Sequence, residues 1–393
     1  MQNKPSILFV LPWNLATVGG VNQVVIHLAR EAARRDRLRP IILCNDWEQE
    51  NFHVGEHDGV TLVSARLRAP LGGDGPVRNL AGFALKMRKD IKAWRNFIRA
   101  QNIRVINAHY AAPGYLLFAA MRALHSARFR LVYSLHGADL ADIVESGKTA
   151  RATNRWMLKQ ADHIVCCSND LAARTIDSLK IDDSRVSTVH NGIDLEELDN
   201  AKKLSYRPAT GGFDKYLINV ATYEHKKGQD VLLDAYLQLV REGLDAGLVL
   251  IGRSTPYLSV LRSRVRKLAL HNHVFFVPDL DHARTLAAIR KARLLVQPSR
   301  EEPFGITLLE AAYMRCPIVA SKTGGIPEVL GGYYPYLVAP DDAPALAQTI
   351  DDALFNPTET GHQVRLLRRR IATGFTWGAA YDAYERHWLG EPE

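Results

Sequence analysis

The chain has 393 residues, too many for one ordinary hydrophobic core, so we expect about two domains. Its content of 47% hydrophobic and 23% charged residues is that of a soluble globular protein. The net charge of +8 suits nucleic acid, an anionic membrane or a phosphorylated ligand. Because no zinc finger, RNA-recognition motif or similar module is recognisable, nucleic acid is not an expected partner.

Cysteine usage and hydropathy predict a cytoplasmic protein. The four cysteines form no Cys-x-x-Cys pair, and the adjacent Cys166 and Cys167 are poor disulfide partners, so we expect a reducing compartment and no zinc site. The apolar run at 6–11 is short and is interpreted as a strand rather than a signal peptide. No run is long enough to cross a bilayer.

Strands and helices alternate through the first half of the chain. Continuous apolar runs such as 6–11 are typical of strands buried on both faces of a parallel sheet. The predicted strands are 6–11, 40–44, 60–63, 105–109, 131–135, 163–167 and 186–189, and the predicted helices are 22–35, 79–101 and 150–160.

Two places in this half are candidates for ligand contact. Gly19 and Gly20 lie in the turn after the first strand, where close helix packing explains them as well as phosphate contact does. The full G-x-G-x-x-G dinucleotide fingerprint is absent. His136 follows strand 131–135, and side chains at the carboxyl ends of parallel strands face the ligand crevice. The alternative for His136 is a histidine that caps a loop.

The predicted helix 79–101 carries many of the basic residues found between Arg66 and Arg104. A basic amphipathic helix lies on anionic membranes, but a domain helix that buries its apolar stripe and solvates its cations has the same pattern. We favour the second interpretation and keep peripheral contact with a membrane as a hypothesis.

The second half repeats the alternation after a linker. Hydrophobicity falls and Lys, Pro, Gly and Thr accumulate between residues 196 and 214. We therefore predict Rossmann-like parallel-sheet domains at 1–203 and 212–374, followed by an aromatic helix within 375–393. The predicted strands are 216–221, 248–251, 274–277, 294–296 and 317–320, and the predicted helices are 229–241, 258–269, 283–292, one from about Ile306 and one opened by Pro327.

The segment 294–328 carries the most specific signal. It contains two strand-to-helix turns with glycine and small residues. Helix N-termini carry free N–H groups and a partial positive charge, so two such turns close together suit a diphosphate.

Two glutamates flank the first of these turns. Glu302 lies in the loop and Glu310 about one turn inside the helix, so they bracket a ligand with the amides of Phe304, Gly305 and Ile306 between them. Carboxylates accept hydrogen bonds from hydroxyls, so a diphosphate with a polyol at each end, which is a nucleotide sugar, is the expected ligand. The alternative is two solvated glutamates beside an ordinary turn.

The pattern Glu302-x7-Glu310 within EEPFGITLLEA, followed by Thr323-Gly324-Gly325, resembles the retaining glycosyltransferases of family 4. The resemblance implies the GT-B fold, an α/β class in which two Rossmann-like domains face a central cleft and the C-terminal helix crosses back to the first domain. It places Glu302 near the donor sugar and Glu310 on the nucleotide ribose. It assigns the intervening amides and the Gly-Gly turn to the sugar and diphosphate.

The resemblance also covers the loop between Ala221 and Gly228. It implies that Lys227 clamps the diphosphate, but the arginine that accompanies it in the family is Thr222 here. A hydroxyl does not replace a bidentate guanidinium. We expect another cation to compensate, with Arg253 as the candidate and Lys226 as an alternative, or weaker donor binding.

In the first half, the resemblance implies that the Gly19-Gly20 pair faces the cleft and that His136 contacts the donor sugar. Asp279-Leu280-Asp281 has the D-x-D form of a metal-binding triplet, but Asp281 is better explained as a helix N-cap. No essential metal and no cofactor besides the donor substrate are expected.

The expected activity is therefore retaining transfer of a sugar from a nucleoside-diphosphate sugar to a glycan, lipid-linked or small-molecule hydroxyl, in polysaccharide or glycoconjugate biosynthesis. The predicted catalytic residues are His136, Lys227 and Glu302. The alternatives are a non-hydrolysing sugar-nucleotide 2-epimerase and a catalytically silent nucleotide-sugar-binding partner.

Overall fold

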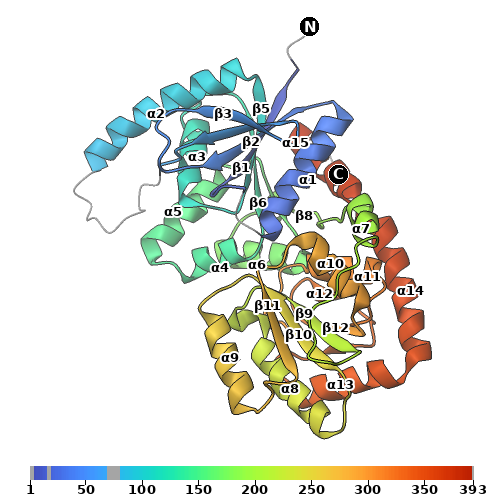
Figure 1. Ribbon diagram of the computed structural model, residues 1–393. Helices are drawn as coiled ribbons and strands as arrows, with labels where there is room; N and C mark the ends of the chain where they lie inside the picture. Colours follow the sequence, from blue (N-terminus) through green and yellow to red (C-terminus); the bar gives the residue numbers. More distant parts are fainter. Residues whose placement is uncertain (1–3, 16–18, 69–79, 392–393) are drawn as a thin grey trace. The chain divides into compact units, whose positions relative to one another are not determined.

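The structure is a computed structural model that describes residues 4–15, 19–68 and 80–391. The chain divides into two compact units (Figure 1). One is Met1–His190 with Trp377–Glu393, and the other is Asn191–Thr376. Each unit is built on one sheet flanked by helices. The predicted α/β class with two parallel-sheet domains is confirmed.

The first unit contains an eight-stranded sheet in the order β3-β4-β2-β1-β5-β6-β7-β8. All neighbouring pairs are parallel except β3 with β4. The strands are β1 Ser6–Leu11, β2 Arg39–Asn45, β3 His53–His57, β4 Val60–Ala65, β5 Ile103–His109, β6 Arg130–Leu135, β7 His163–Cys166 and β8 Val186–Thr188. The helices are α1 Gly20–Arg35, α2 Leu80–Ala100, α3 Leu116–Ala123, α4 Ala138–Glu145, α5 Lys148–Lys159, α6 Asn169–Leu179 and α15 Trp377–Leu389.

Burial in this unit follows the sequence pattern. Strand β1 is buried along its whole length, as its apolar run predicts. Helix α2 buries Met87, Trp94 and Ile98 while Lys86 and Arg88 stay exposed, which confirms the interpretation as a packed domain helix. Within the described residues, no helix is both long enough and apolar enough to span a bilayer.

The second unit contains a six-stranded parallel sheet in the order β11-β10-β9-β12-β13-β14. The strands are β9 Tyr216–Val220, β10 Gly247–Gly252, β11 Val274–Pro278, β12 Leu294–Gln297, β13 Ile318–Ser321 and β14 Leu337–Val338. The helices are α7 Leu195–Ala201, the 3-10 turn η3 His225–Lys227, α8 Gln229–Arg241, α9 Tyr257–Lys267, α10 His282–Lys291, α11 Ile306–Tyr313, α12 Ile326–Leu330, α13 Ala343–Phe355 and α14 Pro357–Gly374.

The strand order of the second sheet indicates where a ligand is expected to bind in this unit. From the central strand β9 the chain moves outward to β10 and β11, then returns to β12 on the other side of β9. The order therefore reverses between β9 and β12. In open parallel sheets, ligands bind outside the carboxyl ends of the strands at such a switch point. The loops after β9 and β12 are the loops singled out from the sequence.

The second unit, Asn191–Thr376, extends beyond the predicted second domain, 212–374, at both ends. Residues 191–203 were assigned to the first domain, but in the structure they belong to the second unit. The reason is helix α7, which buries Leu198 and Ala201 and packs on α10. Asp194 begins this helix by accepting hydrogen bonds from the amides of Glu196 and Glu197.

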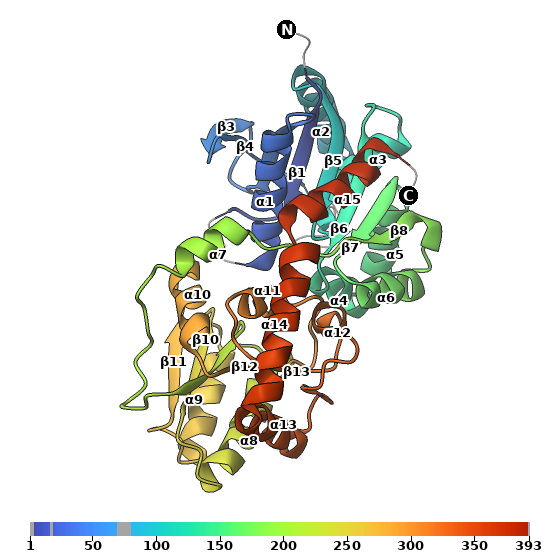
Figure 2. The same ribbon diagram turned by 90° about the vertical axis from the view of Figure 1, so that its right-hand side faces the viewer.

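The C-terminal helix α15 is part of the first unit, where it packs beside β6 and α1 (Figure 2). Trp388 is 1% exposed, and its indole Nε1 donates to the Oδ1 of buried Asn107 at 3.0 Å. Tyr384 bonds the Ser134 hydroxyl at 3.1 Å. Arg37 pairs with Glu385 at 2.7 Å on the outer side. Aromatic residues near the C-terminus thus complete the core of the first unit, most of which comes from the N-terminal half of the chain.

We predict that Trp388→Ala destabilises the first unit by about 3–5 kcal/mol, because it leaves a large cavity and an unpaired Asn107 oxygen. The neighbouring Leu389 is 37% exposed, so Leu389→Ala is the matched control and should change stability little. Scanning calorimetry of both variants measures the difference. Equal melting temperatures for the two would contradict the assigned role of α15.

Candidate functional site

A partly buried ion pair lies at the switch point of the second sheet. Lys227 ends the η3 turn in the loop after β9, and Glu302 lies in the loop after β12. The Lys227 ammonium donates to Glu302 Oε2 at 2.9 Å, and the two side chains are 15% and 12% exposed. Two of the three residues predicted to be catalytic, 75 positions apart in the chain, are thus in direct contact.

The Glu302 carboxylate is also held by neutral donors. Gln297 Nε2 and Ser299 Oγ approach the same oxygen at 3.3 Å and 3.4 Å. A carboxylate removed from water is costly unless it is paired and hydrogen-bonded, and Glu302 meets both conditions. Gln297 and Ser299 were not predicted, although they are the first polar residues after the apolar run of β12.

Glycines allow the loops around this pair to approach each other closely. Gly228 has φ +65°, and a Cβ there would overlap the Pro298 carbonyl. Gly324 has φ +51°, and a Cβ there would overlap the Glu302 carbonyl. Gly325 donates its amide to that carbonyl at 2.9 Å. The predicted Gly-Gly turn therefore packs directly on the backbone that carries Glu302.

The amide groups of the two turns divide into occupied and open ones. Gly325 N–H is occupied by Glu302, and the Thr323 hydroxyl donates to the Arg300 carbonyl at 3.0 Å. In the described part of the chain, the amides of Gly305, Ile306 and Gly324 have no acceptor. Gly305 and Ile306 form the N-terminus of α11, where the helix dipole favours an anion.

Arg300 orders the same loops and was not predicted from the sequence. Its guanidinium binds both oxygens of Asp230 at 2.8 and 2.9 Å and pairs with Asp341 at 2.6 Å. Its backbone amide donates to the Lys226 carbonyl at 2.8 Å. The hydrogen bond to Asp230 is the main cause that raises the pKa of Arg300 above its usual value. A permanently charged fork thus fixes the loop that presents Lys227.

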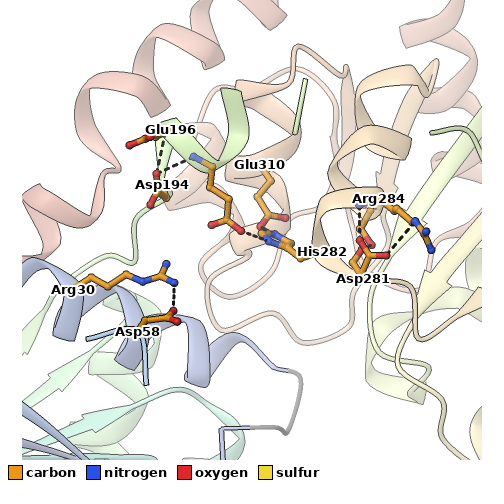
Figure 3. A network of polar contacts seen from close by, with 10 residues as sticks. Arg30, Asp58, Asp194, Glu196, Asp281, His282, Arg284 and Glu310 are labelled. Carbon is orange, nitrogen blue, oxygen red and sulfur yellow. Dashed lines mark hydrogen bonds and ion pairs between the residues drawn. The ribbon is translucent and has the colours of Figure 1, made fainter. Parts of the chain in front are cut away.

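Glu310, the second glutamate of the motif, lies on α11 with 8% exposure. Its Oε1 is 2.7 Å from His282 Nε2, and His282 Nδ1 is 2.9 Å from Glu197 Oε1 (Figure 3). Burial lowers the pKa of His282, but the two carboxylates more than offset this and raise it to about 10. His282 was not predicted, because nothing in the sequence places it beside either glutamate.

The loop of Thr222 has its own cations. Arg253 is half exposed, with a guanidinium nitrogen 3.9 Å from Glu224, and Lys226 pairs with the same carboxylate at 2.9 Å. The Thr222 carbonyl accepts from Gln229. Arg253 therefore lies beside this loop, as a compensating cation should. Within the described structure, no hydrogen bond or ion pair connects it to Lys227 or Glu302.

Asp279 and Asp281 have structural partners. Asp281 caps α10 by accepting from the Arg284 amide at 2.9 Å, which confirms the N-cap interpretation. Asp279 accepts from the amide and hydroxyl of Ser254. Over the residues that the structure describes, no group of three His, Cys, Asp or Glu side chains is arranged to hold a metal ion.

In the first unit, His136 lies just after β6 and its Nε2 is 3.2 Å from Nδ1 of His109 at the end of β5. Burial lowers the pKa of both, that of His136 to about 4, so both rings are neutral near pH 7. Nε2 of His109 is buried with no hydrogen-bond partner among the described residues, so we assign its proton to Nδ1, where it is donated to His136. His136 then carries its own proton on Nδ1.

The structure also shows the surroundings of Gly19 and Gly20 and of the turn that carries His136. Gly20 begins α1, and a Cβ on Gly19 would meet no atom of the described chain within 4 Å, so none of the described residues packs closely against Gly19. Asp139 accepts from the amides of His136, Gly137 and Leu140 and fixes the turn that carries His136.

Two family models match the chain. "Glycosyltransferase Family 4" matches residues 18–197, and "Glycosyl transferases group 1" matches residues 207–369. The chain therefore belongs to the GT-B glycosyltransferases of the group 1 and family 4 type.

Individual proteins agree with this assignment. A glycogen synthase of Mycobacterium tuberculosis is 29% identical over 231 residues, which are 58% of this chain and 54% of that protein, so the match spans about half of its length. A D-inositol 3-phosphate glycosyltransferase of Jonesia denitrificans is 26% identical over 91% of this chain and 88% of its own. The solved structure of Anabaena HepE in complex with UDP and glucose superposes with a TM-score of 0.72 at 19% identity, covering 99% of this chain and 100% of that one.

We predict that Gly324→Ala lowers stability by about 1–3 kcal/mol and separates the turn from the Glu302 backbone, because the new methyl group overlaps the Glu302 carbonyl. Gly332→Ala is the control, since a Cβ there meets nothing within 4 Å and Gly332 has no left-handed φ. Calorimetry compares the two proteins. A Gly324→Ala variant as stable as Gly332→Ala would show that this contact does not hold the loops together.

Proposed function

We propose that this protein transfers a glycosyl group from a nucleoside-diphosphate sugar to a hydroxyl acceptor with retention of anomeric configuration. The observation that carries the proposal is the Lys227–Glu302 pair at the switch point of the second sheet, beside the open amides of the α11 N-terminus. This site offers a cation and N–H donors to a diphosphate and carboxylates to sugar hydroxyls.

The proposed chemistry depends on charge that develops on the leaving group. As the bond from the sugar to the diphosphate breaks, negative charge grows on the phosphate oxygens. Lys227 and the amides of Gly305 and Ile306 stabilise this charge. Glu302 orients donor hydroxyls and does not attack carbon, and Glu310 accepts hydrogen bonds from the ribose. The family resemblance implies a front-face path, in which the leaving phosphate helps to deprotonate the acceptor.

The first unit supplies the remaining proposed contacts. His136 is neutral and, with the tautomer assigned above, offers an Nδ1 proton to a sugar hydroxyl. No described atom lies within 4 Å of a Cβ built on Gly19, which suits contact with the donor, and Gly20 starts α1.

The substrate classes are a hexose-type nucleotide sugar and a glycan, lipid-linked or small-molecule acceptor. UDP is the nucleotide in the HepE structure and is the first to test. We propose that the protein works in the cytoplasm, and that contact with the inner face of a membrane, where it occurs, uses the exposed cations of α2 such as Lys86 and Arg88.

The test is a panel of nucleotide sugars and acceptors, with release of nucleoside diphosphate as the signal. We expect turnover that a chelator leaves unchanged and a product whose anomeric configuration, read by NMR, equals that of the donor. Lys227→Ala should reduce kcat at least about 100-fold, since it removes the cation from the leaving group. Lys291→Ala, on an exposed lysine at the end of α10, should retain full activity.

Other outcomes point to the alternatives. Interconversion of nucleotide sugars without an acceptor would indicate an epimerase. A nucleotide sugar that raises the melting temperature without turnover would indicate a catalytically silent binding partner. The hydroxyl of Thr222 in place of the family guanidinium favours this alternative. Unchanged turnover in Lys227→Ala would contradict the proposed role of Lys227 in stabilising the leaving group.

We also predict that Arg253 partly replaces the missing family arginine. Arg253→Ala should raise the donor KM about three- to tenfold, whereas Arg266→Ala, on the exposed face of α9, should not change it. Thr222→Arg should lower the donor KM, because it restores a guanidinium at the family position. Steady-state kinetics with the preferred donor measure all three. A wild-type donor KM in Arg253→Ala would show that Arg253 does not replace the family arginine that is missing at Thr222.

A further inference from the structure

His282 occupies an unusual position between two carboxylates of the second unit. It is the first residue of α10 and lies 2.9 Å from Glu197 on α7 and 2.7 Å from Glu310 on α11. Figure 3 shows the imidazole with a carboxylate on either side. These partners are 85 and 28 positions away in the chain, so only the fold brings the three together.

The geometry determines the charge of the ring. Both nitrogens of His282 face oxygens of carboxylates, and an ionised carboxylate only accepts hydrogen bonds. Each ring nitrogen therefore carries a proton, and the ring is an imidazolium. The groups that face it are Glu197 from α7 and Glu310 from α11, while Asp281 and Arg284 on its own helix pair with each other. The N-terminus of α10 disfavours the positive charge, but two full negative charges outweigh a helix dipole.

The hydrogen bond with His282 occupies only one of the two carboxylate oxygens of Glu310. Its Oε1 accepts from His282, whereas its Oε2 has no hydrogen-bond donor in the described chain. The side chain is only 8% exposed, so it has little freedom to turn. The result is an ionised carboxylate with one oxygen fixed and the other available to a ligand.

We propose that His282 is a positioning residue for nucleotide binding, which holds the Glu310 carboxylate in its ligand-accepting orientation while Glu197 keeps His282 charged. This inference rests on the proposed function, in which Glu310 accepts hydrogen bonds from the ribose. It extends that site to two residues that do not contact the nucleotide and that come from α10 and α7.

Fastening α7 to the second unit does not require His282. Helix α7 already buries Leu198 and Ala201, Asp199 accepts from the Tyr313 hydroxyl at 3.0 Å, and Arg290 bonds the Lys202 carbonyl. Glu310, in contrast, has His282 as its single side-chain partner in the described residues. A buried carboxylate without a counter-charge is costly, so loss of His282 affects Glu310 first.

The first experiment measures affinity. The full chain is titrated with UDP, ADP and GDP by calorimetry at pH 7.5, and the tightest ligand is used for the variants. We expect His282→Ala to raise Kd about tenfold with kcat within about twofold of wild type, because the contact to ribose is made equally in ground and transition states. His282→Gln, whose amide donates to Glu310, should recover part of the affinity. Arg284→Ala, an exposed residue of the same helix, should match wild type.

The second experiment measures the nucleotide Kd as a function of pH. If His282 had only a structural role, its protonation would not change this Kd. In the wild type, His282 keeps its proton up to about pH 10, so Kd should be flat between pH 6 and 9. Glu197→Gln removes one carboxylate and lowers the pKa of His282. Its Kd should then equal the wild-type value at pH 6 and rise with pH as the ring loses its charge. Ring ¹³C shifts of histidine-labelled protein report the pKa directly.

The outcomes separate this inference from the proposed function. If Glu310→Ala raises Kd about tenfold or more but His282→Ala and Glu197→Gln bind as wild type at every pH, the positioning role is overturned and the nucleotide site stands. If His282→Ala lowers the melting temperature and leaves Kd unchanged, His282 is a structural tether and the inference again fails. If no nucleotide binds, or Glu310→Ala binds as tightly as wild type, the nucleotide site itself is overturned.

Discussion

The contact between Lys227 and Glu302 is the interaction on which the candidate site depends. Both charges are largely withdrawn from water, and such a pair is favourable only when its geometry is good and the remaining polar atoms are satisfied. That condition requires the loops after β9 and β12 to meet, which the strand order makes possible by placing those two strands side by side. The polar donors Gln297 and Ser299 complete the shell.

Close approach of the loops has a steric condition that only glycine meets. At Gly228 and Gly324 the backbone is left-handed and a neighbouring carbonyl occupies the volume of a Cβ, so any other residue would push two loops apart. Arg300 supplies the complementary attraction, because it connects Asp230 and Asp341 across the same region. The ion pair, the glycines and the arginine clamp therefore act on one set of loops, and each supports the geometry of the others.

The parts of this arrangement that have a local sequence pattern were predictable from the sequence. Apolar runs predicted the strands on which the loops depend, and the spacing of Glu302 and Glu310 pointed to a ligand between carboxylates. Strand β3 was missed because most of its side chains are exposed, so it has no apolar signal, and β14 because it is two residues long. His282 was missed for a different reason. A histidine at the start of a helix has no distinctive pattern, and its partners come from helices that only tertiary packing brings near.

The two glutamates of the motif have cationic partners of different kinds, and this difference has a consequence for the proposed reaction. Lys227 is a point charge on a flexible stem and makes one ionic contact, so in the proposed reaction we expect an arriving diphosphate to compete for it and to release Glu302 toward sugar hydroxyls. His282 is a rigid ring fixed by carboxylates on both sides, so we expect the same diphosphate to leave its contact with Glu310 intact. In the proposed reaction, one carboxylate therefore changes partners when the donor binds, and the other stays in place.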